Sequence, residues 1–507
     1  MILNSDKLNS NGTTYSTVNP SIYDNYRKTK DAEMFEEVVQ DLIMNKYSDC
    51  KDTNEFILSL PKKDQRLAIM ALVDKETKGD TNLLWSEMKA YVDSRTDKID
   101  HVKDVIRIIN KFVKDGAVEK KAHGEVMTPI SLVREMLNTL PKEVWSNPNL
   151  KWLDPCNGAG TFPFVVIYKL MNGLSEWEPD IEKRYKHIVE NMIYTCELQS
   201  RNVFLWLCGV DPYDEYTTNT YWGSFLEEGF DKHMKEVWGL EKFDIVIGNP
   251  PYLKSLHIDF IDKSSKISDK IIFIHPSPWL FRGESISKSD NNRINSIKLI
   301  NGNFYFKNAE FGAPLTITYI TDEITDSIHL TFDTSGNSFI VKKLPTGFWE
   351  PNEMMISIFD KFKKLSYVKN LSTLLHKNDG SDLIVTAPRI CGHAVNRTDK
   401  SKFVTNDFYT LFYKNSNLLD KNTSNKVFKT SSIEERENLI HFMKSKICRF
   451  GLYINKLSQD SHINRYLSMI PLPPLDSKYS DIQLCEIFNI TEKEWNFIQE
   501  QICDYYT

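Results

Sequence analysis

A tetrapeptide, Asn249-Pro250-Pro251-Tyr252, carries the most specific chemical signal in the sequence. It follows residues 243–248, an apolar run with the composition of a buried strand. Because the two prolines fix φ and lack backbone donors, the chain must leave this strand as a rigid loop. Such a loop can aim the Asn249 side-chain oxygen and the Pro250 carbonyl at one planar exocyclic amine, such as that of adenine. These two hydrogen bonds would free the nitrogen lone pair, while the Tyr252 ring stacks on the base, a contact worth ~1–3 kcal/mol.

A glycine-rich turn stands 95 residues before this tetrapeptide. It has the sequence DPCNGAG, which contains Asp154, Pro155, Gly158 and Gly160. The glycines allow the backbone to approach a ligand without interference from Cβ atoms, and the aspartate can hold a ligand ammonium group. The spacing lacks both the full G-x-G-x-x-G and the phosphate-binding G-x-x-x-x-G-K-[ST], which disfavours NAD and ATP.

An acidic residue, Glu197, ends the next apolar run, residues 193–196. A carboxylate in this place can accept both hydroxyls of a ribose, as it does in dinucleotide-binding folds. Many glycine turns are purely structural. The turn, the acid and the tetrapeptide together nevertheless predict a nucleotide-like ligand beside an amine-binding loop.

The elements that must position these residues follow from the pattern of apolar positions. Residues 1–122 begin as a polar tail and then show helical periodicity, which predicts a helical N-terminal region. Residues 123–330 alternate short apolar runs with helical stretches, which is typical of an α/β sheet covered on both faces. Residues 331–507 mix polar segments with aromatic residues, and we expect a mixed α+β domain there.

The charge of the chain is distributed unevenly. The 507 residues are 41% apolar and 26% charged, with a net charge of −6, as in an ordinary globular protein. Residues 361–449 contain 17 Lys and Arg against eight Asp and Glu, a net charge of +9, so the remainder of the chain sums to −15. This asymmetry makes residues 361–449 the candidate surface for an anionic partner.

Several classes of protein are disfavoured by what the sequence lacks. No apolar run reaches the ~18 residues that span a bilayer, and the N-terminus does not read as a signal peptide. The eight cysteines form no C-x-x-C pair, so we expect neither a metal site nor a disulfide framework. These observations predict a cytoplasmic protein without a membrane partner.

The order of the motifs resembles the gamma group of DNA amino-methyltransferases, and most closely its adenine-N6 enzymes of restriction-modification systems. The resemblance covers residues 120–325 and rests on HGEVMTPISLVREML (residues 123–137), DPCNGAGTF (154–162), Glu197 and NPPY (249–252). It implies a Rossmann-like, seven-stranded catalytic domain over residues 123–330 that uses S-adenosyl-L-methionine. It also implies a target-recognition domain over residues 331–507 and a prokaryotic or phage origin. The implied reaction is methylation of the N6 amine of an adenine that is flipped out of duplex DNA.

The resemblance also implies roles for residues outside the glycine turn and the tetrapeptide. Thr128 and Pro129 match the segment that contacts the methionine part of the cofactor, and Phe225 would pack on its adenine. The family usually has an aspartate before this phenylalanine, to hold the adenine amine, whereas this chain has Ser224. Phe311, in EFGAPLTITYI, matches a second aromatic residue that packs on the flipped base.

Basic residues of the C-terminal region are the candidates for contacts with DNA phosphates and base edges. They are Arg389, Arg397, Lys400, Lys402, Lys444, Lys446 and Arg449. Whether a separate cognate restriction endonuclease acts with the chain stays open.

Four other functions stay open at this point. Methylation of the N4 amine of cytosine uses the same geometry, and an RNA base is also compatible with it. Enzymes that methylate protein glutamine resemble this turn and tetrapeptide, although they are typically smaller and lack a basic C-terminal module. A DNA-binding specificity subunit without catalysis is the fourth alternative, because of Ser224.

Overall fold

The structure is a computed structural model in which two compact units are described. One unit contains residues 1–275, 287–289 and 318–324, and the other contains residues 276–286, 290–317 and 325–507. Apart from six single positions inside these ranges, the described residues are 81–94, 102–112, 127–278, 293–345, 349–377, 383–385, 426–455 and 467–504.

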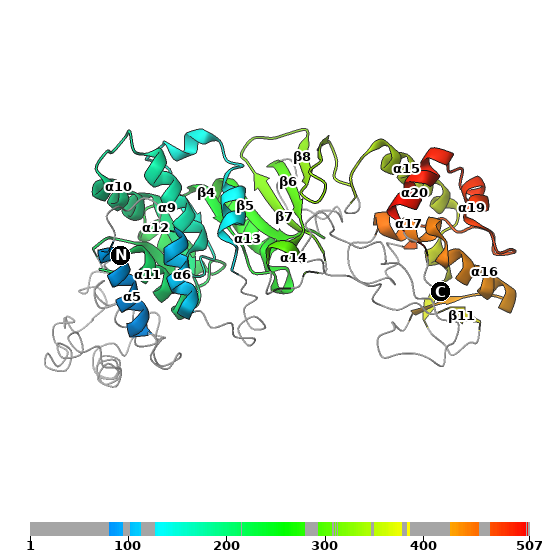
Figure 1. Ribbon diagram of the computed structural model, residues 1–507, viewed down its shortest axis with the longest axis horizontal. Helices are drawn as coiled ribbons and strands as arrows, with labels where there is room; N and C mark the ends of the chain where they lie inside the picture. The colour runs from blue at the N-terminus through cyan, green and yellow to red at the C-terminus, as the bar shows by residue number, and fades with distance from the viewer. Residues whose placement is uncertain are drawn as a thin grey trace. The chain divides into compact units, whose positions relative to one another are not determined.

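A nine-stranded sheet dominates the structure, with the strand order β3-β2-β1-β4-β5-β7-β6-β8-β9 (Figure 1). The pairings of β1 with β2 and β4, of β2 with β3, of β4 with β5 and of β6 with β8 are parallel, and β8 pairs antiparallel with β9. The strands are β1 (Trp152–Asp154), β2 (Ile193–Glu197), β3 (Asn219–Trp222), β4 (Phe243–Gly248), β5 (Ser268–Pro276), β6 (Ile294–Ile300), β7 (Leu315–Ile320), β8 (Ile328–Phe332) and β9 (Ser338–Val341).

This sheet confirms the predicted α/β class. The apolar runs predicted at residues 193–196 and 243–248 form β2 and β4. The sheet has two strands more than the seven that the resemblance implies, because residues 328–341 form a hairpin whose first strand pairs with β6.

The central strands are buried on both faces, so helices must cover both. All residues of β1 and β2 are buried, and so are nine of the 13 residues of α9. The N-terminal helices α5 and α6 pack against α11, and α6 also packs against α9. The helices are α5 (Thr81–Asp93), α6 (Val102–Phe112), α8 (Ile130–Leu137), α9 (Thr161–Gly173), α10 (Ile181–His187), α11 (Ser200–Val210), α12 (Glu228–Glu236), α13 (Leu256–Ile267) and α14 (Gly302–Tyr305), with short turns η3 (Lys142–Trp145), η4 (Ile188–Met192) and η5 (Leu253–Ser255).

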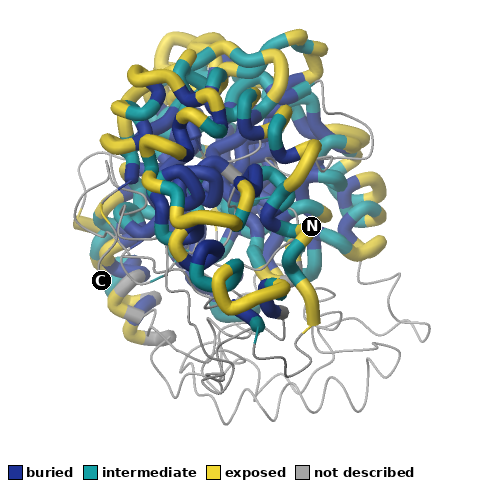
Figure 2. The backbone as a smooth tube through the Cα atoms, turned by 90° about the vertical axis from the view of Figure 1, so that its right-hand side faces the viewer, coloured by how far each residue is buried: buried dark blue, intermediate teal, exposed yellow. Residues whose placement is uncertain are grey.

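The C-terminal region has a core of its own, in which Phe362, Phe442 and Phe450 are buried. A small antiparallel sheet, ordered β10-β12-β11, accompanies its helices, in agreement with the expected mixed α+β composition. Figure 2 shows buried and exposed stretches alternating along the described chain, as amphipathic helices around an apolar core require. The elements are α15 (Glu353–Val368), η8 (Leu371–Leu374), β10 (Leu375–Lys377), β11 (Ile384–Val385), β12 (Lys426–Lys429), α16 (Ile433–Lys444), α17 (Lys446–Asn455), α19 (Asp481–Ile487) and α20 (Glu492–Gln501).

Within the described part of the chain, no helix combines the length and the apolar character that crossing a bilayer requires.

Candidate active site

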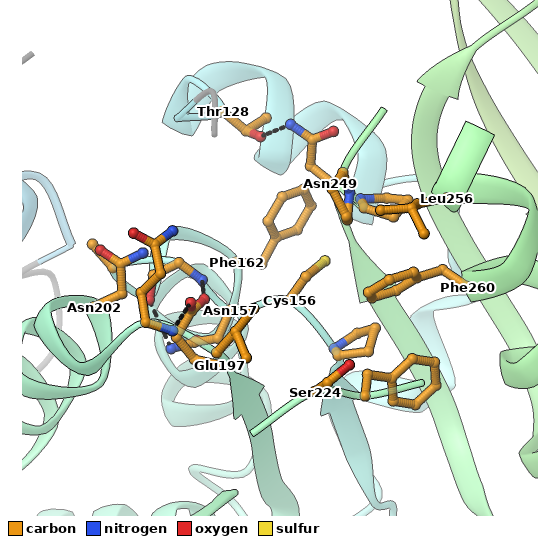
Figure 3. Close-up of a pocket in the computed structure, with 18 of the residues that line it drawn as sticks. Thr128, Cys156, Asn157, Phe162, Glu197, Asn202, Ser224, Asn249, Leu256 and Phe260 are labelled. Carbon is orange, nitrogen blue, oxygen red and sulfur yellow. Dashed lines mark hydrogen bonds between the residues drawn. The ribbon is translucent and has the colours of Figure 1, made fainter. Parts of the chain in front are cut away.

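A cavity of about 300 Å³ lies beside the carboxyl ends of β1, β2 and β4. In doubly wound sheets, ligands bind in the crevice at this edge, where the chain order changes direction. The loops that follow these three strands, together with the loop after β3, line most of the cavity (Figure 3). The predicted residues that line it are Thr128, Pro155, Gly158, Glu197, Ser224, Phe225, Asn249, Pro250, Pro251 and Tyr252.

The glycine turn after β1 is tied to the acid that ends β2. The backbone N–H of Gly158 donates to Oε2 of Glu197 at 2.7 Å, and the N–H of Gln199 donates to Oε1 at 2.8 Å. Gly158 has φ +54°, and a Cβ atom placed on it would meet no atom within 4 Å. The turn therefore leaves open space beside its backbone, next to the carboxylate of Glu197.

Asp154, at the end of β1, is a buried acid with acceptor capacity to spare. Asp154 is only 2% exposed, and its Oδ1 accepts a hydrogen bond from the backbone N–H of Cys156 at 3.1 Å. Oδ2 is buried and has no hydrogen-bond partner among the described residues. Burial is the main cause that raises the pKa of this carboxyl to about 8, and the nearby charge of Glu197 raises it further. A cationic donor would satisfy Oδ2 and favour the carboxylate.

The tetrapeptide lies on the other side of the cavity. Nδ2 of Asn249 donates to Oγ1 of Thr128 at 3.1 Å, as the dashed line in Figure 3 shows. The hydroxyl of Tyr252 donates to the carbonyl of Ile274 at 3.4 Å, a long contact, and its ring meets that of His257 in a T-shaped arrangement with centroids 6.2 Å apart. Burial raises the pKa of the Tyr252 phenol, so this hydroxyl stays protonated.

An aromatic group forms the floor of the cavity beside Ser224. Phe225 is 1% exposed, and its ring lies 4.9 Å from that of Phe230 and 5.2 Å from that of Phe260. The Nζ atom of Lys263 lies 5.2 Å from the centroid of Phe225. Ser224 uses its Oγ atom to accept the backbone N–H of Leu226 at 3.3 Å, so it helps to hold the loop after β3.

Three predicted cofactor residues lie behind the lining rather than in it. Asp154 is buried under the turn. Gly160 is the residue directly before α9 and has φ +97°. A Cβ atom on it would lie 2.6 Å from the Trp206 ring. Pro129 is the residue before α8, and its φ of −59° suits that place. These residues shape the site from behind.

Several residues of the lining were not predicted from the sequence. Gln199 and Asn202 follow Glu197 closely, so their closeness to the predicted ribose acid was an available signal. Leu256 and Phe260 are four residues apart on α13, which places them on one face of that helix. Cys156 and Asn157, within the glycine turn itself, also line the cavity.

Phe311 is not among the residues that line this cavity in the described structure. Its ring packs against Phe306 with centroids 5.5 Å apart. The side chain of Asn303 holds its backbone, because Oδ1 accepts from the Phe311 N–H at 2.8 Å and Nδ2 donates to its carbonyl at 3.0 Å. Its role in stacking on a target base stays a prediction.

The candidate DNA-binding residues are only partly described. Lys444 lies in the last turn of α16, and Lys446 forms an ion pair of 2.9 Å with Asp504. Arg449 is 2% exposed and lies near Asp481, so it belongs to the interior of the C-terminal region, and we do not carry it forward as a phosphate contact. The remaining candidates, Arg389, Arg397, Lys400 and Lys402, lie outside the described residues.

Comparisons with known proteins show what this chain is similar to. A curated relative, an uncharacterized adenine-specific methylase of Mycoplasma pneumoniae, is 24% identical, and the match covers 33% of this chain and 58% of the relative's length. The Type IIL restriction-modification enzyme MmeI in complex with DNA is 11% identical with a TM-score of 0.42, covering 80% of this chain and 82% of that one. A type I restriction-modification methyltransferase subunit from Streptococcus thermophilus is 15% identical with a TM-score of 0.33, covering 63% and 70%. The family described as N-6 DNA Methylase matches residues 103–279, which span the glycine turn, the acid after it and the tetrapeptide. Through these residues, the chain is similar to the N-6 DNA Methylase family, and the match spans little more than half the length of the Mycoplasma pneumoniae relative.

Proposed function

We propose that this chain is a site-specific DNA methyltransferase that transfers a methyl group from S-adenosyl-L-methionine to the N6 amine of adenine in duplex DNA. The observation that carries the proposal is the shared cavity. Asn249 and Tyr252, which suit an aromatic amine, line the same 300 Å³ space as Gly158 and Glu197, which suit a nucleoside. The family match and the relative described as an adenine-specific methylase support adenine as the base.

The residues present fit S-adenosyl-L-methionine. The open space beside Gly158 suits close approach of the cofactor to the turn backbone. Contact of its ammonium group with Asp154 stays a prediction, because that carboxyl lies behind the lining. The carboxylate of Glu197 suits the ribose hydroxyls, and the ring of Phe225 suits the adenine. When bound, the cofactor supplies a methyl group on a sulfonium, which is a good leaving group.

The work of the chain is then to position the acceptor amine. Oδ1 of Asn249 and the carbonyl of Pro250 would each accept a hydrogen bond from one N–H of this amine, which leaves the nitrogen lone pair free to attack in line. The ring of Tyr252 would hold the base by stacking. Because base pairing hides this amine in duplex DNA, the base must be extruded into the cavity. We propose that the basic segment 361–449, with its net charge of +9, contacts the phosphates while this occurs.

Transfer of labelled methyl groups to duplex DNA tests the proposal. We expect the wild-type chain to label DNA and Asn249→Ala to lose about a hundredfold in rate, the loss typical of removing one preorganised hydrogen-bonding group from an active site. Calorimetric binding of S-adenosyl-L-methionine should be retained in this variant, which shows that it is folded. The exposed Asn147 serves as the matched control, since Asn147→Ala removes the same amide outside the cavity.

The identity of the methylated product separates the alternatives. Digestion of the labelled DNA should release N6-methyladenine, whereas N4-methylcytosine would change the base assignment. Labelling of RNA or of protein glutamine instead of DNA would reject the proposal. Binding to DNA without any transfer would favour a non-catalytic specificity subunit.

A further inference from the structure

We propose that Thr128 is a positioning residue for the catalytic amide: its hydroxyl accepts from Nδ2 of Asn249 and thereby keeps Oδ1 directed at the substrate amine. The inference rests on the proposed function, because it concerns how the same site presents its acceptor. It differs from the role that the sequence resemblance implies for Thr128, which is contact with the methionine part of the cofactor.

The hydrogen bond joins two segments that are far apart in the chain. Thr128 and Asn249 are separated by 121 residues, and the Nδ2 to Oγ1 distance is 3.1 Å. Thr128 is 6% exposed, so water competes little for its hydroxyl. Its backbone is constrained by the following Pro129, which directly precedes α8. The hydroxyl is therefore presented from a fixed position.

The main chain of Asn249 is held from the glycine turn. Its backbone N–H interacts with the sulfur of Cys156, which partly offsets the rise in the pKa of that thiol that burial causes. Two segments on the cofactor side of the cavity thus hold one residue, the first through its backbone and the second through its side chain. With the backbone held, rotation of the amide is the main freedom left to this side chain.

That freedom matters because the two ends of an amide are chemically opposite. The oxygen accepts a hydrogen bond from the N–H of an amine, whereas the NH₂ group is itself a donor and would face the donor of the amine. A threonine hydroxyl can donate or accept, but the orientation that binds an amine requires it to accept from Nδ2. Removing the hydroxyl removes this partner and makes the unproductive orientation equally accessible.

The experiment compares Thr128→Val, which keeps the shape and loses the hydroxyl, with Thr128→Ser, which keeps the hydroxyl. We expect Thr128→Val to lower the single-turnover rate of methyl transfer about tenfold at saturating cofactor, the effect of about one hydrogen bond. Thr128→Ser should remain within about threefold of the wild type. The Kd for S-adenosyl-L-methionine should change less than about twofold in both variants. A single turnover excludes effects on product release.

The matched control is Thr139→Val, the same substitution just after α8, where the hydroxyl donates to the carbonyl of Met136 at 2.7 Å. It should leave the single-turnover rate unchanged. If Thr128→Val raises the Kd for the cofactor and keeps the wild-type rate at saturation, Thr128 is a cofactor contact and the inference is overturned. Equal losses in the valine and serine variants would overturn it as well.

A failure of the proposed function has a different signature. If the wild type methylates RNA or protein glutamine rather than DNA, the same variants are measured on that substrate, since the acceptor is again an NH₂ group. If it methylates none of them, the proposed function fails, and chemical unfolding of Thr128→Val, Asn249→Ala and the double variant decides the inference. If the midpoint shift of the double variant equals the sum of the shifts of the two single variants, the two side chains are not coupled and the inference is overturned. A shift of the double variant that is smaller than this sum supports the inference.

Discussion

The carboxyl of Asp154 gives the stability of the protein an unusual dependence on pH. Its folded-state pKa is about 8, against an ordinary value of 3.8, because burial penalises the charged form. Between these values the folded chain binds more protons at this residue than the unfolded chain does. The free energy of unfolding contributed by Asp154 is therefore highest below about pH 4 and falls as the pH rises toward about 8.

We predict that Asp154→Asn, which has nearly the same shape and no charge, removes this contribution. Two histidines, His233 and His257, titrate with the opposite sign, because burial lowers the pKa of each to about 4. The informative quantity is therefore the difference in unfolding midpoint between variant and wild type, measured without cofactor. This difference should grow in favour of the variant from pH 5 to pH 8 and then level off. A constant offset over the whole range would contradict the prediction.

The turn between β1 and α9 uses its two glycines for different purposes. Gly158 has open space where a Cβ would stand, whereas a Cβ on Gly160 would lie 2.6 Å from Trp206 and 2.8 Å from Phe164. Both have positive φ, so alanine is strained at either position. The first glycine keeps the cavity open and the second allows α9 to pack.

We predict that the two alanine variants separate binding from stability. Gly158→Ala should lower the free energy of unfolding by about 1 kcal/mol, the strain alone, and weaken cofactor binding because its Cβ enters the cavity. Gly160→Ala should lower it by about 3 kcal/mol, because the aromatic rings must move as well. Denaturant unfolding and calorimetric titration measure the two effects. If both variants lose stability equally, the space beside Gly158 is not open in solution.

The same elements show what sequence patterns can and cannot predict. The apolar runs of β1, β2 and β4 and the turn after β1 are local signals, since burial and left-handed backbone select residue types directly. The position of β7 between β5 and β6 is decided by pairing between distant segments, which periodicity does not encode.

The residues of the candidate site also divide into those that a local sequence pattern predicts and those that depend on packing. The glycine turn and the tetrapeptide were predicted, because the residues of each motif are consecutive in the sequence and their types alone indicate the chemistry. Phe260 was missed because its place in the lining depends on how α13 packs against the sheet. The unpartnered oxygen of Asp154 depends on three-dimensional burial, so only the structure could identify it.

Over the whole chain, the charge is distributed so that one segment is basic and would attract an anionic partner such as the proposed DNA, whereas the remainder is acidic. Residues 361–449 carry a net charge of +9 and the rest of the chain −15. A uniform acidic protein would be repelled by phosphates, so binding would have to depend on this segment. Each phosphate contact that releases a counterion adds about 0.9 to the slope of log affinity against log salt concentration.

We predict that replacing four basic residues of the segment by glutamine weakens DNA binding and lowers this slope by up to about 3.6, while binding of S-adenosyl-L-methionine is unchanged. A second quadruple variant, made at exposed lysines of the other unit, removes the same charge from the whole molecule and controls for net charge. Its slope should match the wild type. Equal slopes in the two variants would show that net charge, rather than this segment, governs binding. The tested set is Arg389, Arg397, Lys400 and Lys402, and the control set is Lys142, Lys232, Lys235 and Lys242.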